Sequence, residues 1–481
     1  MEKDKIRKAA ILNLGCKVNK YEADAMKDKL LMAGYEVVEP QEKADIYIVN
    51  TCSVTNMAQK KSRQMLRRAK KMNPEAVVVA AGCYVNAEHD ALLNELFVDI
   101  VVGNNCKKYI VTVIEDFLKK RSADSRYLDI NRTQEFEEMG SLRAFHMDHT
   151  RAYIKIQDGC NQFCSYCIIP YTRGRVRSRR PEYILEEIRG LAKQGVKEFV
   201  LTGIHISSYG TDWKDGNMQY DDVTSGQENG QMVLPKRQGV TGLSDLIREI
   251  TAIPEVVRIR LGSLEPRIVT EEFLTELEKN DKFCPHFHLS LQSACNATLK
   301  RMNRKYTIEE FMEICGRIRA HFERPAITTD VIVGFPGETE EEFGMTLANL
   351  RELALYEIHV FKYSVRTGTV AAKLPNQVSE EVKGMRSDIL LRLTAQQKEA
   401  YERSMKGYVD EALFEEVSAN EEMLAQCAEV TRPEEVDTGD VLSSLLHREE
   451  TYYIGHTRRY VKVKLLAEDS MINRVVKVKF M

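Results

Sequence analysis

The feature that most constrains the fold of this chain is a strand-then-helix rhythm that repeats along residues 151–383. Short apolar strands alternate with helical patterns, as expected for parallel strands joined by crossover helices. The predicted strands are 153–157, 198–201, 257–261, 287–291, 329–333 and 359–363. The predicted helices are 181–193, 243–253, 271–279, 308–320 and 340–353. These units predict a full or partial parallel barrel whose reactive groups lie at the carboxyl ends of the strands.

Three cysteines follow the first of these strands. Cys160, Cys164 and Cys167 form a CxxxCxxC cluster, and thiolates are the soft ligands that hold iron–sulfur clusters. A site with three protein ligands keeps one coordination position open for chemistry. A zinc knuckle is the alternative interpretation, but it needs a fourth Cys or His at short spacing. The next histidine is His205, far beyond that spacing.

The first segment, residues 1–118, also alternates short strands with helical patterns, which predicts an open α/β sheet. Three of its predicted strands end shortly before a cysteine, namely 11–14 before Cys16, 45–49 before Cys52 and 77–81 before Cys83. Open α/β sheets place their ligands at this edge. The three thiols are therefore candidates for a second metal centre, although buried free cysteines are also common. The other five cysteines are interpreted as structural: Cys106, Cys284, Cys295, Cys315 and Cys427.

Changes in composition and pattern delimit the remaining segments. Residues 119–150 are polar with weak periodicity and are interpreted as a linker, and residues 384–404 predict a connecting helix. Residues 209–241, rich in Gly, Asp, Gln and Asn, are interpreted as a mobile loop over the barrel mouth or as an insertion. Residues 405–481 contain short alternating strands, which predict a small β-barrel. The whole chain is thus an α/β multidomain protein.

The last segment interleaves aromatic and basic side chains, a pattern that suits stacking on bases and pairing with phosphates. The residues concerned are Tyr452, Tyr453, Arg458, Arg459, Tyr460, Lys462 and Lys464. The alternative interpretation is that the lysines protect edge strands and solvate one face. A formal net charge of -3 gives no global nucleic-acid signature, so any RNA binding depends on such local patches.

The sequence indicates a protein of the reduced cytoplasm. No stretch is long and apolar enough to cross a bilayer, and the charged start is not followed by a signal-peptide core. We therefore expect a cytoplasmic protein without membrane attachment. In that compartment, eleven cysteines indicate metal or redox chemistry and not a disulfide framework.

The sequence around the first cysteine cluster resembles the radical S-adenosylmethionine superfamily, and within it the methylthiotransferase family. The resemblance is carried by residues 158–170, by the basic run 173–179 and by the turn 334–339. The N-terminal cysteines, together with a terminal barrel similar to the family's TRAM domain, extend it over nearly the whole chain. The opening residues 14–22 (LGCKVNKYE) resemble the subgroup that methylthiolates threonylcarbamoyladenosine in transfer RNA.

This resemblance implies an activity, cofactors and partners. The implied reaction converts N6-threonylcarbamoyladenosine next to the anticodon to its 2-methylthio derivative by a deoxyadenosyl radical mechanism. The implied cofactors are S-adenosyl-L-methionine and two 4Fe-4S clusters, one on Cys160, Cys164 and Cys167 and one on Cys16, Cys52 and Cys83. The implied partners are tRNA, an electron donor and a sulfur source.

Three alternatives to this activity stay open. Sister groups of the family act on isopentenyladenosine in tRNA or on an aspartate of a ribosomal protein. A more distant alternative is a non-catalytic iron–sulfur regulator that binds RNA. An open iron beside a barrel mouth disfavours that last alternative, because a regulator has no use for it.

Further cofactor contacts are expected at the strand ends and in the basic run, and no catalytic residue is assigned beyond the cluster ligands. The expected contacts are Thr202, Gly203, Ser263, Glu265, Ser290, Gln292, Gly334, Gly337 and Arg177. Glycine allows backbone to approach a ligand closely. The four arginines at 173, 175, 177 and 179 are expected to bind the cofactor carboxylate or an RNA phosphate, or else to line a solvated loop. His286 and His288 share one face of a strand and are interpreted as hydrogen-bonded barrel residues.

Overall fold

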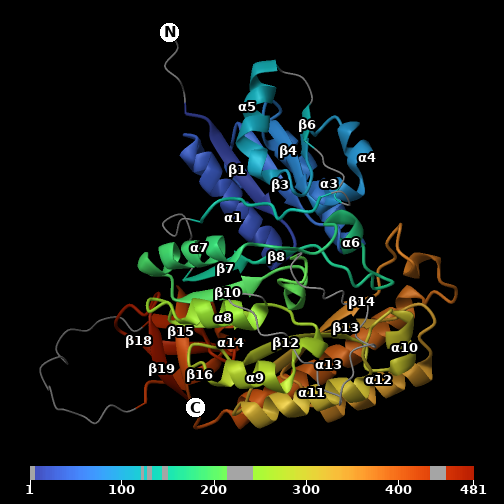
Figure 1. Ribbon diagram of the computed structural model, residues 1–481, viewed down its shortest axis with the longest axis vertical. Helices are drawn as coiled ribbons and strands as arrows, with labels where there is room; N and C mark the ends of the chain where they lie inside the picture. Colours follow the sequence, from blue (N-terminus) through green and yellow to red (C-terminus); the bar gives the residue numbers. More distant parts are fainter. Residues whose placement is uncertain are drawn as a thin grey trace, which may run out of the picture.

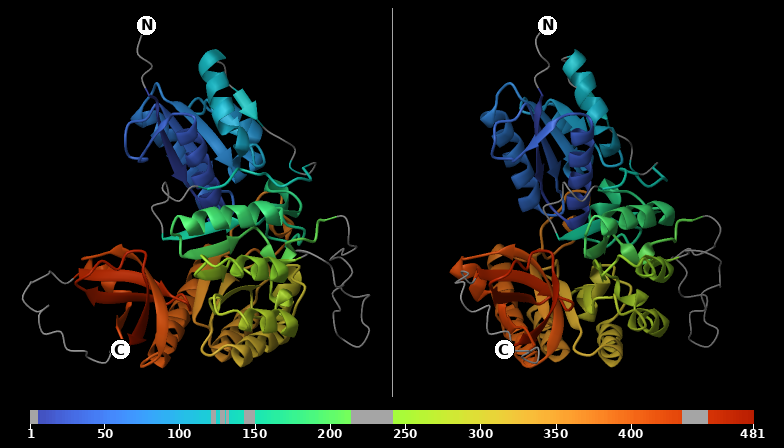
Figure 2. Two further views of the ribbon diagram at one scale, coloured as in Figure 1. Left: turned by 60° about the vertical axis from the view of Figure 1, so that its left-hand side comes forward. Right: turned by 90° about the vertical axis from the view of Figure 1, so that its left-hand side faces the viewer.

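The computed structural model describes residues 6–120, 124–126, 130, 133–142, 150–213, 242–433 and 451–481. An N-terminal α/β unit, a central barrel and a small C-terminal barrel follow one another along the chain (Figure 1). The C-terminal barrel lies beside the central barrel, away from the N-terminal unit (Figure 2). Most of the predicted 209–241 loop falls outside the described residues. No described helix combines the length and the apolar character that a membrane span requires.

The N-terminal unit is a parallel sheet of order β2-β1-β3-β4-β5-β6, which confirms the predicted open α/β sheet. Strands β3 and β4 are buried along their whole length, as expected for continuous apolar runs covered on both faces. The strands are β1 (Lys8–Asn13), β2 (Glu36–Val38), β3 (Ile46–Thr51), β4 (Val77–Gly82), β5 (Ile100–Val102) and β6 (Asp124–Arg126). The helices are α1 (Lys17–Met32), α2 (Asn56–Met72), α3 (Cys83–Ala87), α4 (His89–Leu93) and α5 (Ile110–Lys120).

The segment interpreted as a linker over 119–150 is not wholly a linker. Strand β6 lies within it and pairs in parallel with β5, with Ser125 opposite Val101. Its sequence, Asp-Ser-Arg, contains no apolar residue and so gives no periodic signal. The sheet therefore has one more strand, next to β5, than the sequence pattern indicates.

The central part is a partial parallel barrel, as predicted. It consists of two sheets, β11-β10-β7 and β12-β13-β14, joined by isolated bridges at Ile259–Phe283 and Leu264–Leu289. Among the described strands, β7 and β14 do not pair, so the barrel is open between its first and last strands. The strands are β7 (Arg151–Lys155), β10 (Glu198–Thr202), β11 (Arg258–Leu261), β12 (His286–Gln292), β13 (Ala326–Val333) and β14 (Glu357–Lys362).

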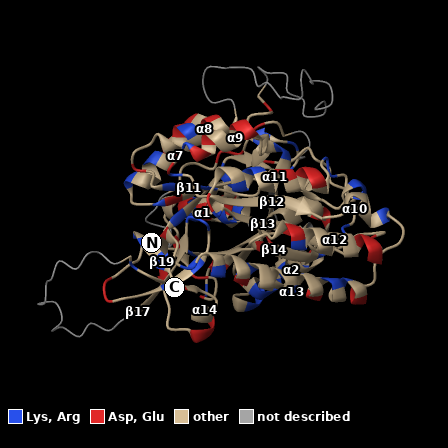
Figure 3. Cartoon of the chain, turned by 90° about the horizontal axis from the view of Figure 1, so that it is seen from below, with Lys and Arg blue, Asp and Glu red and all other residues tan. Residues whose placement is uncertain are grey.

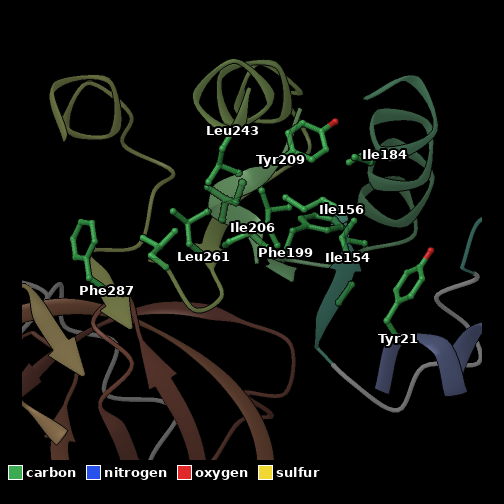
Figure 4. Packing of buried hydrophobic residues seen from close by; sticks show 14 of the residues in the cluster. Tyr21, Ile154, Ile156, Ile184, Phe199, Ile206, Tyr209, Leu243, Leu261 and Phe287 are labelled. Atoms are coloured by element: carbon green, nitrogen blue, oxygen red, sulfur yellow. The ribbon is translucent and has the colours of Figure 1, made fainter. Parts of the chain in front are cut away.

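Outer helices cover the barrel, and basic and acidic residues intermingle on them where Figure 3 shows α8, α9 and α11. The helices are α7 (Pro181–Lys193), α8 (Leu243–Thr251), α9 (Glu271–Glu278), α10 (Asn296–Arg301), α11 (Ile308–His321) and α12 (Glu340–Leu353). Buried apolar side chains fill the layer between strands and helices. Figure 4 shows Ile154, Phe199 and Leu261 of the strands near Ile184 of α7 and Leu243 of α8. Burial of this apolar area stabilises the barrel at roughly 25 cal/mol per Å².

Helix α13 (Glu380–Ser404) leads into a closed barrel of order β15-β17-β18-β16-β19, which confirms the predicted small β-barrel. Its elements are β15 (Val409–Val417), α14 (Glu421–Ala425), β16 (Ala428–Thr431), β17 (Thr451–Thr457), β18 (Lys462–Ala467) and β19 (Val475–Phe480). Gly455 of β17 lies where a Cβ atom would come within 2.3 Å of the carbonyl oxygen of Leu413. Only glycine allows the two strands to approach so closely.

Three residues expected to bind RNA instead attach this small barrel to the central one. The ring of Tyr460 stacks between His286 and His456, with centroids 4.9 Å and 4.7 Å away. Arg459 donates to the carbonyl oxygen of Glu323 at 2.7 Å, and Arg458 donates to that of Phe283 at 2.7 Å. A sequence pattern of aromatic and basic residues cannot distinguish a protein partner from RNA, because both are bound by stacking and hydrogen bonds.

Candidate active site

The N-terminal cysteines lie where three neighbouring parallel strands end. Cys16 directly precedes α1, Cys52 follows β3, and Cys83 begins α3 immediately after β4. The pairing of β1 with β3 and of β3 with β4 places these ends side by side. Gly15 has a φ of +104° and lies so close that a Cβ atom there would be 3.0 Å from the Cys52 Sγ. The three thiols therefore share one edge of the sheet.

Two of these thiols, Cys16 and Cys52, have pKa values above the ordinary range. Burial raises the pKa of Cys16 against the lowering effect of Arg173, and burial together with the charge of the nearby Cys83 raises the pKa of Cys52 to about 11. Cys16 is exposed to solvent, whereas Cys52 and Cys83 are buried. Such thiols bind a metal only as thiolates, so cations at this site must offset the cost of deprotonating them.

The second set of cysteines lies in the loop after β8 (Gln157–Asp158), before the short helix α6 (Ile169–Thr172). Gly159 begins this loop with a φ of +73°, and a Cβ atom there would be 1.8 Å from the carbonyl oxygen of Arg175. The loop is anchored to the end of α10, because the amide of Ser165 donates to the carbonyl oxygen of Met302 at 3.0 Å. The thiols of Cys160, Cys164 and Cys167 are all partly exposed.

A partly buried arginine that the sequence analysis missed contacts this loop. Nη1 of Arg304 donates to the Cys164 Sγ at 3.3 Å, and its Nη2 donates to the carbonyl oxygen of Ser290 at 2.8 Å. Burial, aided by the charge of Cys164, raises the pKa of Cys160 to about 11, although the Gln162 amide and Arg304 act to lower it. Arg304 follows α10 without any recognisable motif, so only the fold identifies it.

The donor sets fit iron–sulfur clusters. Within the described parts of the chain, no three His, Cys, Asp or Glu side chains are arranged to hold a single metal ion. A four-iron cluster sets a different requirement, because each thiolate binds a separate iron atom. Two sets of three soft thiolates, each beside a guanidinium group, match that requirement and leave one iron without a protein ligand.

Arg173 connects the two sets of cysteines. It lies just beyond the CxxxCxxC loop, and its Nε donates to the Cys83 Sγ at 3.2 Å. Its Nη2 donates to the Asn19 side chain at 2.6 Å, and its Nη1 donates to Glu22 at 2.7 Å and to Asp158 at 3.1 Å. The guanidinium is fully buried. One side chain of the barrel thus contacts a thiol of the N-terminal unit.

Around Arg173 lies a group of buried charges that we call the interdomain charge cluster, formed by Glu22, Lys107, Lys155, Asp158 and Arg173. Lys155 donates to Glu22 at 2.7 Å and lies 2.6 Å from Asp158, and Lys107 also donates to Glu22. Burial acts to raise the pKa of Glu22, but the three cations outweigh it and hold that pKa well below its usual range. Because Glu22 is on α1 and Lys155 is on β7, the cluster fixes the N-terminal unit on the barrel.

A second contact fixes the N-terminal unit at the other side of the barrel opening. Arg366, in the loop after β14, donates to the Asn56 side chain at 2.5 Å and to the Gln59 side chain at 3.2 Å. The Asn56 amide donates to the Ser364 hydroxyl at 3.2 Å. Asn56 is the first residue of α2, shortly after Cys52. The N-terminal unit therefore lies over the side of the barrel where β8 and α6 are found (Figure 1).

The predicted cofactor contacts lie at the carboxyl ends of the barrel strands, and their role stays a prediction. Gly203 follows β10, and a Cβ atom there would be 2.8 Å from Ile206 Cγ2. The Ser290 carbonyl oxygen accepts from Arg304, which places the end of β12 beside the cysteine loop. The remaining members are Thr202 at the end of β10, Ser263 and Glu265 after β11, Gln292 at the end of β12, and Gly334 and Gly337 after β13.

Two of the predicted cofactor contacts, Gly334 and Arg177, also form hydrogen bonds within the chain, and their role toward the cofactor stays a prediction. The amide of Gly334 donates to Glu338, and Glu338 lies 3.2 Å from Arg386 of α13, so the 334–339 turn is closed by its own side chains. Arg177 is fully buried, and its Nη1 donates to the carbonyl oxygen of Arg175 at 3.1 Å.

The basic run is not a phosphate-binding loop. Arg173, Arg177 and Arg179 are buried, and Arg179 pairs with Glu138 at 2.6 Å. Arg175 alone among the four is exposed, with its guanidinium 4.4 Å from the centroid of the Phe163 ring. The acidic partners all lie outside the run, and some, such as Glu22 of α1, are far away in the chain, so the sequence around the arginines gives no sign of their burial.

Comparison with known proteins agrees with this architecture. Residues 154–350 match the Radical SAM superfamily, and residues 8–103 match Uncharacterized protein family UPF0004. A solved structure of similar fold is the radical S-adenosylmethionine methyltransferase TsrM from Kitasatospora setae. Its TM-score is 0.52 at 15% identity, covering 74% of this chain and 75% of that one.

Closer relatives are found among curated proteins. The chain is 37% identical over 473 residues to the threonylcarbamoyladenosine tRNA methylthiotransferase MtaB of Bacillus subtilis, covering 98% of this chain and 93% of that protein. It is 37% identical over 402 residues to MtaB of Aquifex aeolicus, covering 83% of this chain and 91% of that protein. It is 33% identical over 426 residues to the tRNA-2-methylthio-N(6)-dimethylallyladenosine synthase of Natranaerobius thermophilus, covering 86% of this chain and 87% of that protein. Two sets of three cysteines on two joined parallel sheets, in a chain that aligns with these relatives over most of its length, identify an enzyme of the radical S-adenosylmethionine methylthiotransferase family.

Proposed function

We propose that this enzyme converts N6-threonylcarbamoyladenosine next to the anticodon of tRNA to its 2-methylthio derivative. The observation that carries the proposal is the arrangement of Cys16, Cys52 and Cys83 at a sheet edge that Arg173 joins to the CxxxCxxC loop. The near full-length similarity to proteins named for threonylcarbamoyladenosine supports this substrate over isopentenyladenosine. A tRNA substrate implies action in the cytoplasm, and the reaction also requires an electron donor and a sulfur source.

Enzymes of this family use S-adenosylmethionine and two 4Fe-4S clusters. We assign one cluster to Cys160, Cys164 and Cys167 and the other to Cys16, Cys52 and Cys83. When bound, the cofactors supply the radical chemistry that opens an unactivated C–H bond. The chain's own contribution is to hold the two sites in one orientation.

Several groups of the chain contact the cysteines or the loops that carry them. Arg304 and Arg173 each donate a hydrogen bond to one cysteine sulfur, and such bonds tune the reduction potential of a cluster. The backbone amide of His205 donates to Gln157 at 2.7 Å, which fixes the loop after β10 against the loop that carries the cysteines. Burial, followed by the charge of Arg304, lowers the pKa of His205 to about 4, so this imidazole is neutral at physiological pH.

Iron analysis tests the assignment of the cysteines. We expect about eight irons per chain after anaerobic reconstitution, as two four-iron clusters require. Changing Cys16, Cys52 and Cys83 together to Ala is expected to halve this content. Cys427→Ala, in the C-terminal barrel, is the matched control and should leave it unchanged. An unchanged iron content in the triple variant would contradict the second site.

Nucleoside mass spectrometry tests the substrate. Transfer RNA from a strain lacking this protein should contain threonylcarbamoyladenosine without its methylthio derivative, and the protein should restore that derivative. Restoration of the methylthio mark on isopentenyladenosine, or on a ribosomal aspartate, would overturn the proposed substrate in favour of a sister activity. Formation of no 5′-deoxyadenosine from S-adenosylmethionine and dithionite would leave only the non-catalytic regulator.

A further inference from the structure

Helix α2 concentrates positive charge on one element of the N-terminal unit. Among the described helices of eight or more residues, it alone contains no Asp or Glu. Its cationic residues are Lys60, Lys61, Arg63, Arg67, Arg68, Lys70 and Lys71. Because the whole chain has a formal net charge of -3, this excess of cations is local and does not follow from the composition.

The cations of α2 lie on the outside of the helix. Ser62, Leu66 and Ala69 are its buried residues, and they face the sheet, where α2 packs on β3 and β4. With 3.6 residues per turn, Lys60 and Lys71 lie opposite that buried face, and both are exposed. The helix from Lys60 to Lys71 is about 17 Å long, so its outer face is a row of cations and not a single charge.

Most of these cations have no acidic partner. Four of them make no hydrogen bond or ion pair with the described residues, namely Lys60, Lys61, Arg68 and Lys71. Arg67 lies over the Phe97 ring at 5.0 Å from its centroid, a contact that does not neutralise its charge. Lys70 differs, because it pairs with Asp99 at 2.9 Å. Like charges three or four positions apart destabilise a helix, so a bound polyanion would stabilise α2.

The chain holds α2 in a fixed position beside the barrel opening. The Cys52 amide donates to the Ser62 hydroxyl at 3.3 Å, which ties the helix to one of the proposed cluster ligands. In the first turn, the Asn56 side chain accepts from Arg366 of the barrel at 2.5 Å. A helix that connects parallel strands runs back from their carboxyl ends. The row of cations therefore starts near the cysteines and leads away from them along the N-terminal unit.

The end of α2 that is nearest to the cysteines also exposes apolar side chains. Val54 and Met57 are 50% and 71% exposed. The Asn56 side chain donates to the carbonyl oxygen of Val365 at 3.0 Å, and Val365 is exposed as well. Exposed apolar side chains that gather at one place mark interaction sites, and unpaired bases present apolar faces to such side chains.

A tRNA substrate fits this arrangement of charges. The modified adenosine has to reach the space between the two sets of cysteines, and it is covalently attached to its RNA. The neighbouring phosphates must then lie on the surface around the opening, where α2 begins. Arg458 and Arg459, which the sequence pattern favoured for RNA binding, instead donate to carbonyl oxygens of the central barrel. Cations in a row bind phosphates and so position an RNA without reading its bases.

We propose that the α2 basic face, formed by Lys60, Lys61, Arg67, Arg68 and Lys71, binds the sugar–phosphate backbone of the anticodon stem–loop and aligns the tRNA on the opening. This inference rests on the proposed function and adds to it a surface that positions the substrate. Because the contacts are made to phosphates, they act equally on stem–loops with and without the threonylcarbamoyl group.

The salt dependence of RNA binding tests the proposal without measuring turnover. The anaerobically reconstituted enzyme is titrated into fluorescently labelled anticodon stem–loop RNA, and anisotropy gives the affinity between about 50 mM and 200 mM salt. Changing Lys60, Arg68 and Lys71 together to Gln removes three phosphate contacts. The slope of log affinity against log salt should become less steep by about 2 to 3. Binding should weaken to the same degree for the modified and the unmodified stem–loop.

Two further variants make the outcome decisive. The matched control removes three exposed cations from helices that also contain acidic residues, namely Arg189→Gln, Lys193→Gln and Arg248→Gln, and should keep the wild-type slope. Lys71→Gln alone, at the end of α2 remote from Cys52, should reduce the slope by about 1. A wild-type slope in the triple α2 variant with full iron content would refute the inference, as would an equal loss in the control. The proposed function fails separately, if tRNA bound by the wild-type enzyme gains no methylthio group.

Discussion

Glu22 is predicted to be the residue on which the docking of the N-terminal unit most depends. Its carboxylate is almost completely buried and pairs with Lys107, Lys155 and Arg173. Glu22→Gln keeps the shape of the side chain but removes its charge. Three buried cations then face Asp158 as the remaining carboxylate of the interdomain charge cluster. Breaking a buried pair in this way costs about 3–5 kcal/mol, because one side keeps its desolvation penalty without its partner.

Thermal unfolding of the apoprotein at pH 7 measures this loss. A destabilisation of that size should lower the midpoint of the first transition by about 10 °C. Asp24→Asn on the same helix is the control, because the Lys20–Asp24 pair is closer to the surface and spaced i,i+4, where such pairs contribute about 0.3–0.5 kcal/mol. Equal midpoints for the two variants would refute the conclusion that the charge cluster holds the two units together.

The same residue predicts a pH dependence. Because the pKa of Glu22 is depressed in the folded protein, its contribution to stability is complete above the unfolded carboxyl pKa of about 4.3 and declines as the pH falls below it. The difference in midpoint between wild type and Glu22→Gln should therefore shrink in acid. A difference that grows below pH 4 would contradict the assigned sign.

Three further changes have distinct expected results. Gly15→Ala places a methyl group 3.0 Å from the Cys52 Sγ and should remove about half of the reconstituted iron, leaving S-adenosylmethionine cleavage measurable; full iron content would contradict it. Gly159→Ala meets a backbone carbonyl oxygen at 1.8 Å and should abolish that cleavage, and retained 5′-deoxyadenosine formation would contradict it. Although burial opposes it, hydrogen bonds from His456 and Arg151 lower the pKa of Glu415 to about 2. Wild-type apoprotein should therefore lose stability between pH 4 and pH 2 relative to Glu415→Gln, and parallel acid unfolding curves would argue against this.

The regular elements of the fold could be predicted from sequence where strong hydrophobic periodicity was delimited by a clear start or stop signal. Helix α7 begins at Pro181 as expected, because proline is favoured at the first helical turn. The cysteines could be placed at strand ends, because parallel strands bring their carboxyl ends to one edge. Strand β6 could not be predicted from sequence, because Asp-Ser-Arg has no apolar residue and the strand is defined by its pairing with β5.

The partners of the basic residues could not be predicted from the sequence. Arg179 and Tyr460 have the composition of an RNA contact, yet Arg179 pairs with Glu138 and Tyr460 stacks on His286. Whether a cation faces solvent or a buried carboxylate depends on contacts between residues far apart in the chain. The interpretation of His286 and His288 as hydrogen-bonded barrel residues is confirmed, since both contact the Thr328 hydroxyl.

The hydrogen bond from Arg173 to Cys83 spans 90 positions of the chain, and this has a consequence for biosynthesis. The ribosome completes the N-terminal sheet, with all three of its cysteines, before it has made the guanidinium that contacts one of them. Lys155 and Arg173, which are two of the three cations around Glu22, are also synthesised later. A nascent chain that ends before residue 150 therefore lacks the Arg173 partner of Cys83 and two of the cationic partners of Glu22. The N-terminal unit can therefore dock on the barrel through the interdomain charge cluster only after both segments have been synthesised.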